Sequence, residues 1–288
     1  MILCIVGPTG VGKTKLSVEL AKKYDAIIIN CDAMQVYKEL NIGTAKVTDE
    51  EKENIPHYLF DIRNVDEEYT VFDYQRDCRK LLDEYKDKNI IIVGGTGLYL
   101  KAALYDYRFQ EEQHSPVDYS KYSNEELYKM VLEKDPDCKI HPNNRIRMER
   151  FLNKEVTEPV EPVSLYNHTI IGLTTDRDIL YDRINKRVDT MVQNGLLDEV
   201  KSFYDQHIYT KPLMGGIGYK ELYQYFDGKI SLEKALDKIK QNSRHYAKRQ
   251  YTFFNNQFDV QWFHVDFNDF NNTINDVVKY VENKYDRS

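Results

Sequence analysis

The sequence begins Met1-Ile-Leu-Cys-Ile-Val6, and Gly7-Pro-Thr-Gly-Val-Gly-Lys-Thr14 follows at once; these two stretches decide the fold. The first is an apolar run, typical of a strand buried on both faces of a parallel sheet. The second matches G-x-x-x-x-G-K-[ST], in which glycines let successive N–H groups point at phosphate oxygens. A helix-compatible apolar pattern resumes at Leu16. A glycine-rich turn that matches by chance is the alternative, but both flanks favour a di- or triphosphate site.

The side chains at the end of this loop point to its chemistry. Lys13 is placed to reach a terminal phosphate, and the Thr14 hydroxyl is placed to hold Mg²⁺ as a cofactor. The positive end of the following helix dipole adds to the attraction for an anion. The predicted phosphate-binding residues are Gly7, Pro8, Thr9, Gly10, Val11, Gly12, Lys13 and Thr14.

The composition limits the classes of protein to which this chain can belong. The chain has 288 residues, enough for one large domain or two small ones, and 41% of them are hydrophobic. No apolar run approaches the length of a membrane span, and the N-terminus lacks the features of a signal peptide. The four cysteines are far apart and form no C-x-x-C pair. We expect a cytoplasmic protein with reduced thiols and no membrane association, and a monomer because no interface signature stands out.

The net charge of −7 gives no sign of a nucleic-acid partner, although basic residues gather locally. The three groups lie at 145–150, 183–187 and 238–249. Such groups are commonly ordinary solvated helix faces, so only their arrangement in space can decide.

Strand and helix patterns alternate along much of the chain, as in an α/β protein with a mostly parallel sheet. The expected strands are 1–6, 26–30, 57–62, 89–93, 169–174 and, at an edge, 260–263. The first expected helix follows the loop and ends near 24, and the next are 71–85 with Thr70 as its N-cap, 98–104, 177–194 and 196–204. A turn over 212–218 precedes the expected helix 219–226, Ser231 is the expected N-cap of a helix that reaches about 254, and the last expected helix is 273–285. We therefore predict a P-loop NTPase-like parallel sheet flanked by helices.

The pattern changes between the fourth and fifth expected strands. A polar, tyrosine-rich stretch is followed by two short expected helices, 124–132 and 143–152, and by the proline-punctuated linker 157–164. We predict a small helical domain inserted at 108–165. The α/β core then comprises 1–107 and 166–288.

Two further features restrict the reaction. The expected strand 89–93 ends in Gly94-Gly-Thr-Gly97 instead of the acidic pair of a motor ATPase, and the nucleotide-reading elements of a regulatory GTPase are missing. Asp32 follows the expected strand 26–30, and the carboxyl ends of parallel strands share one rim with the phosphate loop. The remaining reactions are phosphoryl transfer to a small molecule, or one in which diphosphate is the leaving group.

Several sequence blocks occur in one order along the chain. Asp32-Ala-Met-Gln-Val-Tyr37 is similar to D-S-x-Q-V-Y, and Val93-Gly-Gly-Thr-Gly-Leu-Tyr99 matches V-G-G-T-G-L-Y. Further blocks are the phosphate loop, Gly43-Thr-Ala-Lys46, His57-Tyr-Leu-Phe-Asp61, Ile140-His-Pro-Asn-Asn144 with Arg147 and Arg150, Gly218-Tyr-Lys-Glu221 and Arg244-His-Tyr-Ala-Lys-Arg-Gln250. Together they resemble the bacterial-type tRNA dimethylallyltransferases, from Leu3 to about Phe254.

The resemblance implies transfer of a dimethylallyl group from dimethylallyl diphosphate to N6 of adenosine 37 in tRNA, with release of diphosphate. The loop then holds the donor diphosphate, and Lys13 with Mg²⁺ stabilises the leaving charge. Asp32 is the expected general base, with an outer-sphere Mg²⁺ ligand as its alternative role. Thr96 is expected to contact the target nucleotide or order the reacting groups, with a plain helix N-cap as its alternative.

The implied partner is the anticodon stem-loop of tRNA, from which the target base must be extracted. The expected tRNA-binding residues are Asp32, Ala33, Met34, Gln35, Thr96, Arg147, Arg150, Lys248 and Arg249. Ala33 stands where the family pattern has Ser. Gly215 and Gly216 stand where members often carry Arg or Gln, with Arg183, Lys220 or Arg249 as candidates to compensate.

Three other functions compete with this one. An ATP-dependent small-molecule or nucleoside kinase explains the loop, but not the insertion or the block 244–250. Prenylation of free adenine nucleotides needs no surface that grips an RNA stem. A non-catalytic RNA-binding protein has no need of an intact Lys13-Thr14 together with Asp32.

Overall fold

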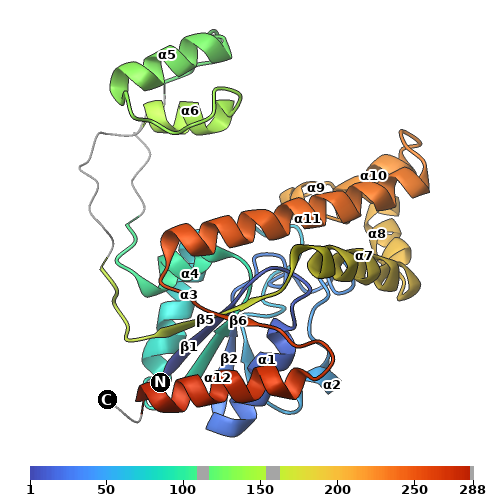
Figure 1. The fold of residues 1–288 in the computed structure, drawn as a ribbon. Coiled ribbons are helices and arrows are strands. Elements are labelled where there is room, and N and C mark those ends of the chain that lie inside the picture. Colours follow the sequence, from blue (N-terminus) through green and yellow to red (C-terminus); the bar gives the residue numbers. More distant parts are fainter. Residues whose placement is uncertain (109–116, 154–162, 286–288) are drawn as a thin grey trace. The chain divides into compact units, whose positions relative to one another are not determined.

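The computed structural model describes residues 1–108, 117–153 and 163–285. The chain divides into two compact units (Figure 1). The core unit comprises Met1–Tyr105 and Ser164–Ser288, and the helical unit comprises Asp106–Val163. The helical unit therefore begins and ends two residues before the bounds predicted for the insertion, 108 and 165. Most of the predicted linker 157–164 lies outside the described residues.

The core unit is built on a six-stranded sheet with the strand order β3-β2-β4-β1-β5-β6, and every pair in it is parallel. The strands are β1 (Ile2–Val6), β2 (Ala26–Asn30), β3 (His57–Tyr58), β4 (Asn89–Val93), β5 (Thr169–Thr174) and β6 (Gln261–His264). This confirms the predicted parallel α/β fold. Strand β3 is shorter than the predicted 57–62, because Leu59 and Asp61 adopt φ values of 62° and 54°, which end the extended backbone.

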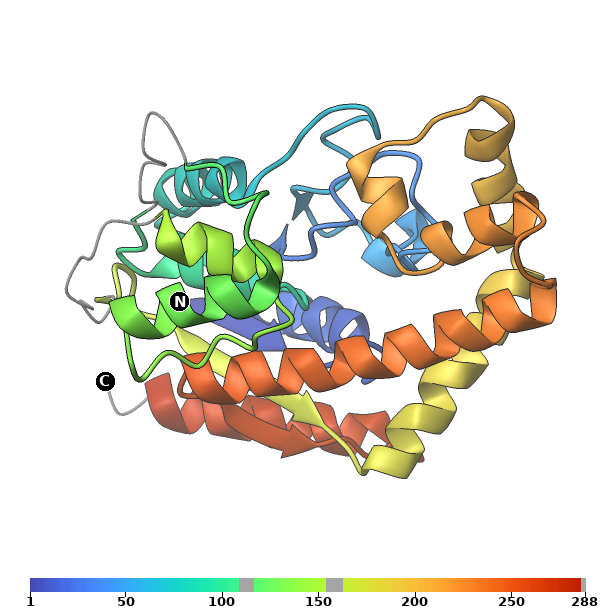
Figure 2. The ribbon, with the colours of Figure 1, turned by 90° about the horizontal axis from the view of Figure 1, so that it is seen from above.

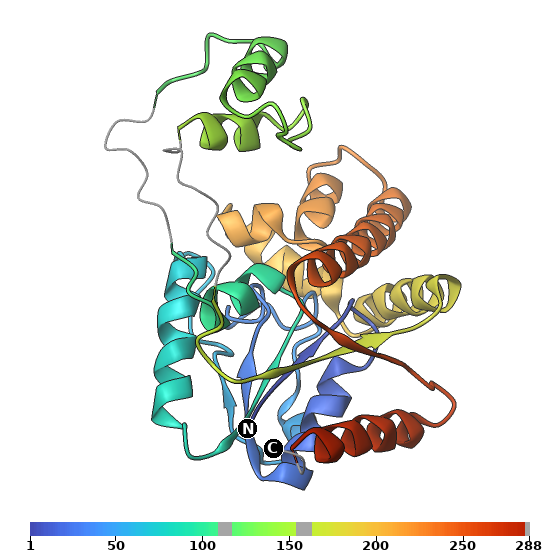
Figure 3. The same cartoon turned by 60° about the vertical axis from the view of Figure 1, so that its left-hand side comes forward.

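Alternate residues of the strands feed two hydrophobic cores, one on each face of the sheet. In β1, Leu3 and Ile5 belong to one core, while Cys4 and Val6 belong to the other. Helices α1 (Lys13–Tyr24) and α12 (Phe270–Tyr285) cover the first face, and α3 (Val71–Glu84) and α4 (Gly97–Leu104) cover the second (Figure 3). The two-sided burial explains why these strands read as continuous apolar runs in the sequence.

Most of the remaining helices of the core unit gather beside the carboxyl ends of the strands (Figure 2). They are α7 (Arg177–Gln193), α8 (Leu196–Asp205), α9 (Lys211–Gly215), α10 (Tyr219–Phe226) and α11 (Leu232–Gln257). The short helix α2 (Asp49–Lys52) precedes β3 and packs against α1. The long helix α11 packs against α4, α7 and α10. Helix α2 was not predicted, and the turn predicted over 212–218 is wrong in part, because α9 forms there with Pro212 in its first turn.

Predicted helix caps at Thr70 and Ser231 are confirmed. The Thr70 hydroxyl accepts a hydrogen bond from Asp73 N at 3.2 Å, and the Ser231 hydroxyl accepts one from Lys234 N at 3.3 Å. Each side chain satisfies one of the N–H groups that a helix start leaves without a partner.

The helical unit has its own small core. Helices α5 (Asn124–Lys134) and α6 (Arg145–Leu152) pack on each other. The fully buried residues between them are Leu127, Val131 and Met148. Among the described residues of both units, no helix is long and apolar enough to cross a membrane.

A core this small makes the helical unit sensitive to one truncation. We predict that Met148→Ala destabilises the helical unit by about 2–5 kcal/mol, because it removes a fully buried side chain and leaves a cavity. Trp262 is the only tryptophan of the chain and lies in the core unit. In urea, the variant should lose helix by circular dichroism early, while the fluorescence transition of Trp262 stays at its wild-type midpoint.

Ile146→Ala, on the same helix but 66% exposed, is the matched control and should leave both transitions unchanged. A Met148→Ala variant whose fluorescence and dichroism midpoints move together would show that the two units do not unfold separately.

Candidate active site

The phosphate loop, residues 7–14, joins the carboxyl end of β1 to the start of α1. Gly7, Gly10 and Gly12 adopt φ values of 137°, 87° and 97°, a region that favours glycine. Gly12 is the N-cap of α1, and a Cβ there would lie 2.7 Å from the Phe270 ring. The loop backbone therefore has the shape that turns N–H groups toward an anion at a helix start.

Lys13 lies across this loop. Its Nζ donates hydrogen bonds to the carbonyl oxygens of Gly7 at 3.0 Å and Pro8 at 2.7 Å. Burial lowers the pKa of the Lys13 ammonium to about 7; the nearby Arg187 lowers it as well, and Asp32 opposes the shift. An anion in the loop would favour the charged ammonium again.

Two arginines one turn apart on α7 lie beside the loop. Arg183 Nε donates a hydrogen bond to Gly10 O at 3.0 Å, and its guanidinium stacks on the Phe267 ring at 3.8 Å. Arg187 donates to Thr44 O at 3.4 Å, and burial lowers its pKa while Asp32 opposes that shift. Arg183 was a predicted candidate for this place, whereas Arg187 was predicted only as a member of the basic group 183–187 and not as a site residue. The signal for both was their spacing of four on a helix that follows β5, the neighbour of β1.

Asp32 is held at the rim by its own neighbours. Asn30, buried at the end of β2, accepts a hydrogen bond from Asp32 N at 2.9 Å. The Asn30 amide donates to the carbonyl oxygens of Asp32 at 3.0 Å and Leu59 at 2.9 Å. The Asp32 carboxylate accepts from Met34 N at 2.9 Å and stays half-buried. This network fixes the direction of the carboxylate.

Thr96 belongs to the second loop, residues 94–97, which follows β4. Thr96 occupies the N-cap position of α4, yet its side chain makes no capping hydrogen bond. Its Oγ1 instead accepts from Ala33 N at 3.0 Å. Burial raises the pKa of the nearby Tyr246 hydroxyl, and Thr96 opposes that shift. Thr96 N donates to Cys31 O at 3.0 Å. The structure therefore ties the second loop to the Asp32 segment, residues 32–35.

The other residues of the Asp32 segment are half-buried and face the loops around them. Gln35 donates its amide to Thr44 O at 3.1 Å. The Met34 side chain lies against Gly216, where an added Cβ would be 2.8 Å from Met34 Cε. These contacts bring the segment together with the block at 43–46 and with the end of α9.

Side chains on one face of α11 complete the site, although no role was predicted for them. Gln250 accepts a hydrogen bond from Thr9 N and donates one to Gly95 O, and Tyr246, one turn earlier, lies beside Thr96. The spacing of four in the block 244–250 was the available signal. Lys248 and Arg249, which were predicted, are exposed on α11.

The described residues are suited to a magnesium ion that takes most of its ligands from a bound substrate and only a few from the protein. They contain no cluster of three His, Cys, Asp or Glu side chains. Mg²⁺ commonly keeps several waters and takes one or two protein oxygens together with substrate phosphate oxygens. The exposed Thr14 hydroxyl in the first turn of α1, with Asp32 on the same rim, offers such a donor set.

Arg147 and Arg150 lie on α6 of the helical unit. Both are exposed, and their spacing of three places them on one helix face, as predicted. Arg145, beside them, instead binds the carbonyl oxygens of Tyr119 and Tyr122 within the unit.

Three residues were candidates to compensate for the glycines at 215 and 216, where family members often carry Arg or Gln. Of these three, Arg183 contacts the phosphate loop. Lys220 lies 3.8 Å from Glu221, and Arg249 stacks on Tyr246. Glu221 is buried and accepts from Gly218 N at 2.8 Å, so the block 218–221 serves the start of α10.

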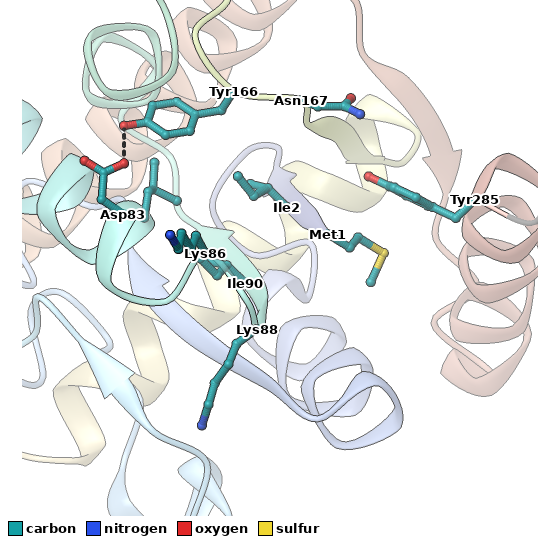
Figure 4. A pocket seen from close by; sticks show the side chains of 10 residues that line it. Met1, Ile2, Asp83, Lys86, Lys88, Ile90, Tyr166, Asn167 and Tyr285 are labelled. Carbon is teal, nitrogen blue, oxygen red and sulfur yellow. Dashed lines mark hydrogen bonds between the residues drawn. The ribbon is translucent and has the colours of Figure 1, made fainter. Parts of the chain in front are cut away.

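A separate pocket of about 380 Å³ lies at the amino ends of β1 and β4 (Figure 4). Met1 and Tyr285 line it, together with Lys86, and Tyr166 donates a hydrogen bond to Asp83 at 3.3 Å on its wall. This end of the sheet is opposite the two glycine-rich loops. The pocket is therefore no part of the candidate active site.

Comparisons with known proteins agree with this geometry. The family model described as IPP transferase matches residues 35–257. A tRNA dimethylallyltransferase from Anoxybacillus flavithermus is 44% identical over 99% of this chain and 97% of its own length.

Solved structures give the same result. The full-length tRNA isopentenylpyrophosphate transferase of Bacillus halodurans is 40% identical, with a TM-score of 0.78 over 99% of this chain and 97% of that chain. A eukaryotic dimethylallyltransferase acting on tRNA is 28% identical, with a TM-score of 0.77 over 91% of this chain and 73% of that chain. With its fold, its loops and these likenesses, the chain belongs to the tRNA dimethylallyltransferase family of prenyltransferases.

Proposed function

We propose that this protein transfers the dimethylallyl group of dimethylallyl diphosphate to N6 of adenosine 37 in tRNA and releases diphosphate. The observation that carries the proposal is the contact between two parts of the site. We call the phosphate loop with its cations the diphosphate half-site, and the Asp32 segment with the second loop the acceptor half-site. The phosphate loop and the Asp32 segment lie on one rim, and Thr96 and Gln250 join both to the second loop. This arrangement suits a reaction that separates a diphosphate from a carbon while an amine attacks that carbon.

The diphosphate half-site supports departure of the leaving group. When the C1–O bond of the donor breaks, negative charge grows on the diphosphate. Lys13, the loop N–H groups and the Arg187 guanidinium provide positive charge in a partly desolvated place, where such charge stabilises most. Mg²⁺ held by Thr14 would share the same charge as a Lewis acid.

The acceptor half-site supports attack by the amine. An exocyclic adenine amine is a weak nucleophile, because its lone pair is delocalised into the ring. As the N6–C1 bond forms, N6 loses a proton, and the Asp32 carboxylate is the base that takes it. The two hydrogen bonds between the Asn30 side chain and the Asp32 backbone, one donated by each residue, keep the carboxylate oriented. Thr96 orders the same segment through Ala33 N.

The anticodon stem-loop is the proposed partner. Exposed cations are present on both units: Arg147 and Arg150 on the helical unit, and Lys248 and Arg249 on α11. Phosphate contacts of this kind give affinity to a chain whose net charge is −7. A tRNA substrate also implies a cytoplasmic location.

The experiment that tests this function incubates the purified protein with unmodified tRNA, Mg²⁺ and dimethylallyl diphosphate, followed by nucleoside mass analysis. We expect a dimethylallyl mass on adenosine from tRNA and none on free AMP. We also expect Asp32→Asn to lower kcat by about 10²–10⁴-fold, because the amide cannot accept the proton.

The control is Asp87→Asn, an exposed change in the turn before β4 at the other end of the sheet, which should keep full activity. Transfer to AMP but not to tRNA would indicate a free-nucleotide prenyltransferase. ATP consumption with a small molecule and no prenyl product would indicate a kinase.

The pKa of Lys13 gives a second prediction. Above about pH 7, the ligand-free ammonium loses its proton, and a bound diphosphate restores it. At about pH 8, binding of inorganic diphosphate with Mg²⁺ should therefore take up nearly one proton per site. At about pH 6 the number of protons taken up should be smaller, because the ligand-free Lys13 is already mostly protonated. Calorimetry in buffers of different ionisation enthalpy measures this number.

Lys13→Arg is the matched control, since it keeps the cation but cannot lose the proton at these pH values. Equal proton uptake by the wild type and Lys13→Arg would contradict the assignment to Lys13.

The exposed arginines of α6 give a third prediction. The double variant Arg147→Ala/Arg150→Ala should weaken tRNA binding and flatten the salt dependence. The slope of log K against log[salt] should fall by roughly 1–2, because up to two phosphate contacts are lost. Inorganic diphosphate affinity should stay unchanged.

Lys279→Ala/Lys284→Ala removes two exposed cations from α12 and is the charge-matched control. An identical change of slope in both double variants would mean that only overall charge matters.

A further inference from the structure

We propose that Gln250 is a positioning residue that sets the spacing between the phosphate loop and the second loop. The proposal rests on the proposed function, because these loops are taken to carry the leaving diphosphate and the acceptor base. Gln250 is 4% exposed and lies on α11, more than 150 residues along the chain from either loop.

The Gln250 amide makes one hydrogen bond to each loop. Its Oε1 accepts from Thr9 N at 3.1 Å, and its Nε2 donates to Gly95 O at 3.0 Å. The amide is planar, so these two bonds fix the distance between one backbone atom of each loop. No single carboxylate, hydroxyl or ammonium supplies the same rigid pair of donor and acceptor.

The surroundings are shaped for this amide. A Cβ on residue 95 would lie 2.0 Å from Gln250 Nε2, so glycine at this position is what lets the amide approach the backbone. Tyr246, one helical turn earlier, lies beside Thr96 in the same loop. Helix α11 therefore binds the second loop at Gly95 through Gln250, and the same side chain joins that loop to Thr9.

The spacing matters because the reaction joins groups held by different loops. The backbone link between their strands ends at Gly94 N, which donates to Ile5 O at 3.2 Å. Beyond it, Gln250 joins Thr9 to Gly95. A displacement of about 1 Å between reacting groups can cost about 10²-fold in rate.

The test compares Gln250→Met, which removes both hydrogen bonds at similar volume, with Gln250→Glu. An ionised glutamate still accepts from Thr9 N but repels Gly95 O, whereas a protonated one donates to Gly95 O. We expect Gln250→Met to lower kcat at saturating donor and tRNA by about 10-fold or more, with KM for tRNA changed less than about threefold.

The pH profile separates positioning from mere structural support. We expect Gln250→Glu to lose kcat by about 10-fold at about pH 8 and to regain much of it relative to wild type near pH 6, as the buried carboxyl takes up a proton. Gln250→Met should show the same relative loss at both pH values. Gln261→Glu, an exposed change of the same kind on the edge strand β6, should match wild type throughout.

Hydrogen exchange at the Thr9 amide gives a readout that needs no activity. Its N–H bonds Gln250, so Gln250→Met should speed its exchange by about 10-fold, while Gln250→Glu should keep it protected. Full kcat in a folded Gln250→Met variant would overturn the proposal, and so would unchanged Thr9 exchange. Equal, pH-independent losses in both variants would also overturn it, since they would indicate structural support alone. A wild type that binds diphosphate but transfers nothing to tRNA would overturn the proposed function, and Thr9 exchange would still decide the role of Gln250.

Discussion

Parallel pairing of β1 with β4, and of β4 with β2, is the constraint on which the site depends. In a parallel sheet the carboxyl ends of neighbouring strands lie at one edge, so three chain segments far apart in sequence must meet there. These segments are the phosphate loop, the second loop and the Asp32 segment. The two hydrophobic cores on either face hold the strands in this register, because a slip by one residue would exchange the side chains that fill the two cores.

The charges on this edge of the sheet are separated, with the cations beside the phosphate loop and the Asp32 carboxylate on the other side. Lys13 and Arg187 lie near each other, and burial disfavours the charge on both, while Asp32 opposes that effect from the acceptor side. Positive charge held in a partly desolvated place is poised for an anion and gains most when one arrives. The same proximity places the Asp32 carboxylate beside the two cations of the phosphate-loop side.

Hydrogen bonds from distant parts of the chain complete the site. Asn30 orients the Asp32 backbone, and Thr96 reaches Ala33 from the next loop. Glu199 on α8 holds the neighbouring block at 41–43 in the same way. Its carboxylate accepts hydrogen bonds from the backbone N–H groups of residues 41–43 and from the Tyr219 hydroxyl. Buried polar groups with complete partners fix one arrangement, which suits a reaction that depends on alignment.

The sequence by itself determined the parallel α/β fold, the phosphate loop, the caps at Thr70 and Ser231, and the family, because each depends on local pattern or on short motifs. It could also place Asp32 on the rim through the strand rule. Tertiary structure decided the roles of Arg187, Tyr246 and Gln250, whose contacts span up to 241 residues of chain. It also decided that the Thr96 side chain accepts a hydrogen bond from Ala33 N and does not cap α4. The spacing of four on α7 and α11 is visible in the sequence, but it does not say which remote residues these side chains contact. Only the packing of α7 and α11 on the loops could show these partners.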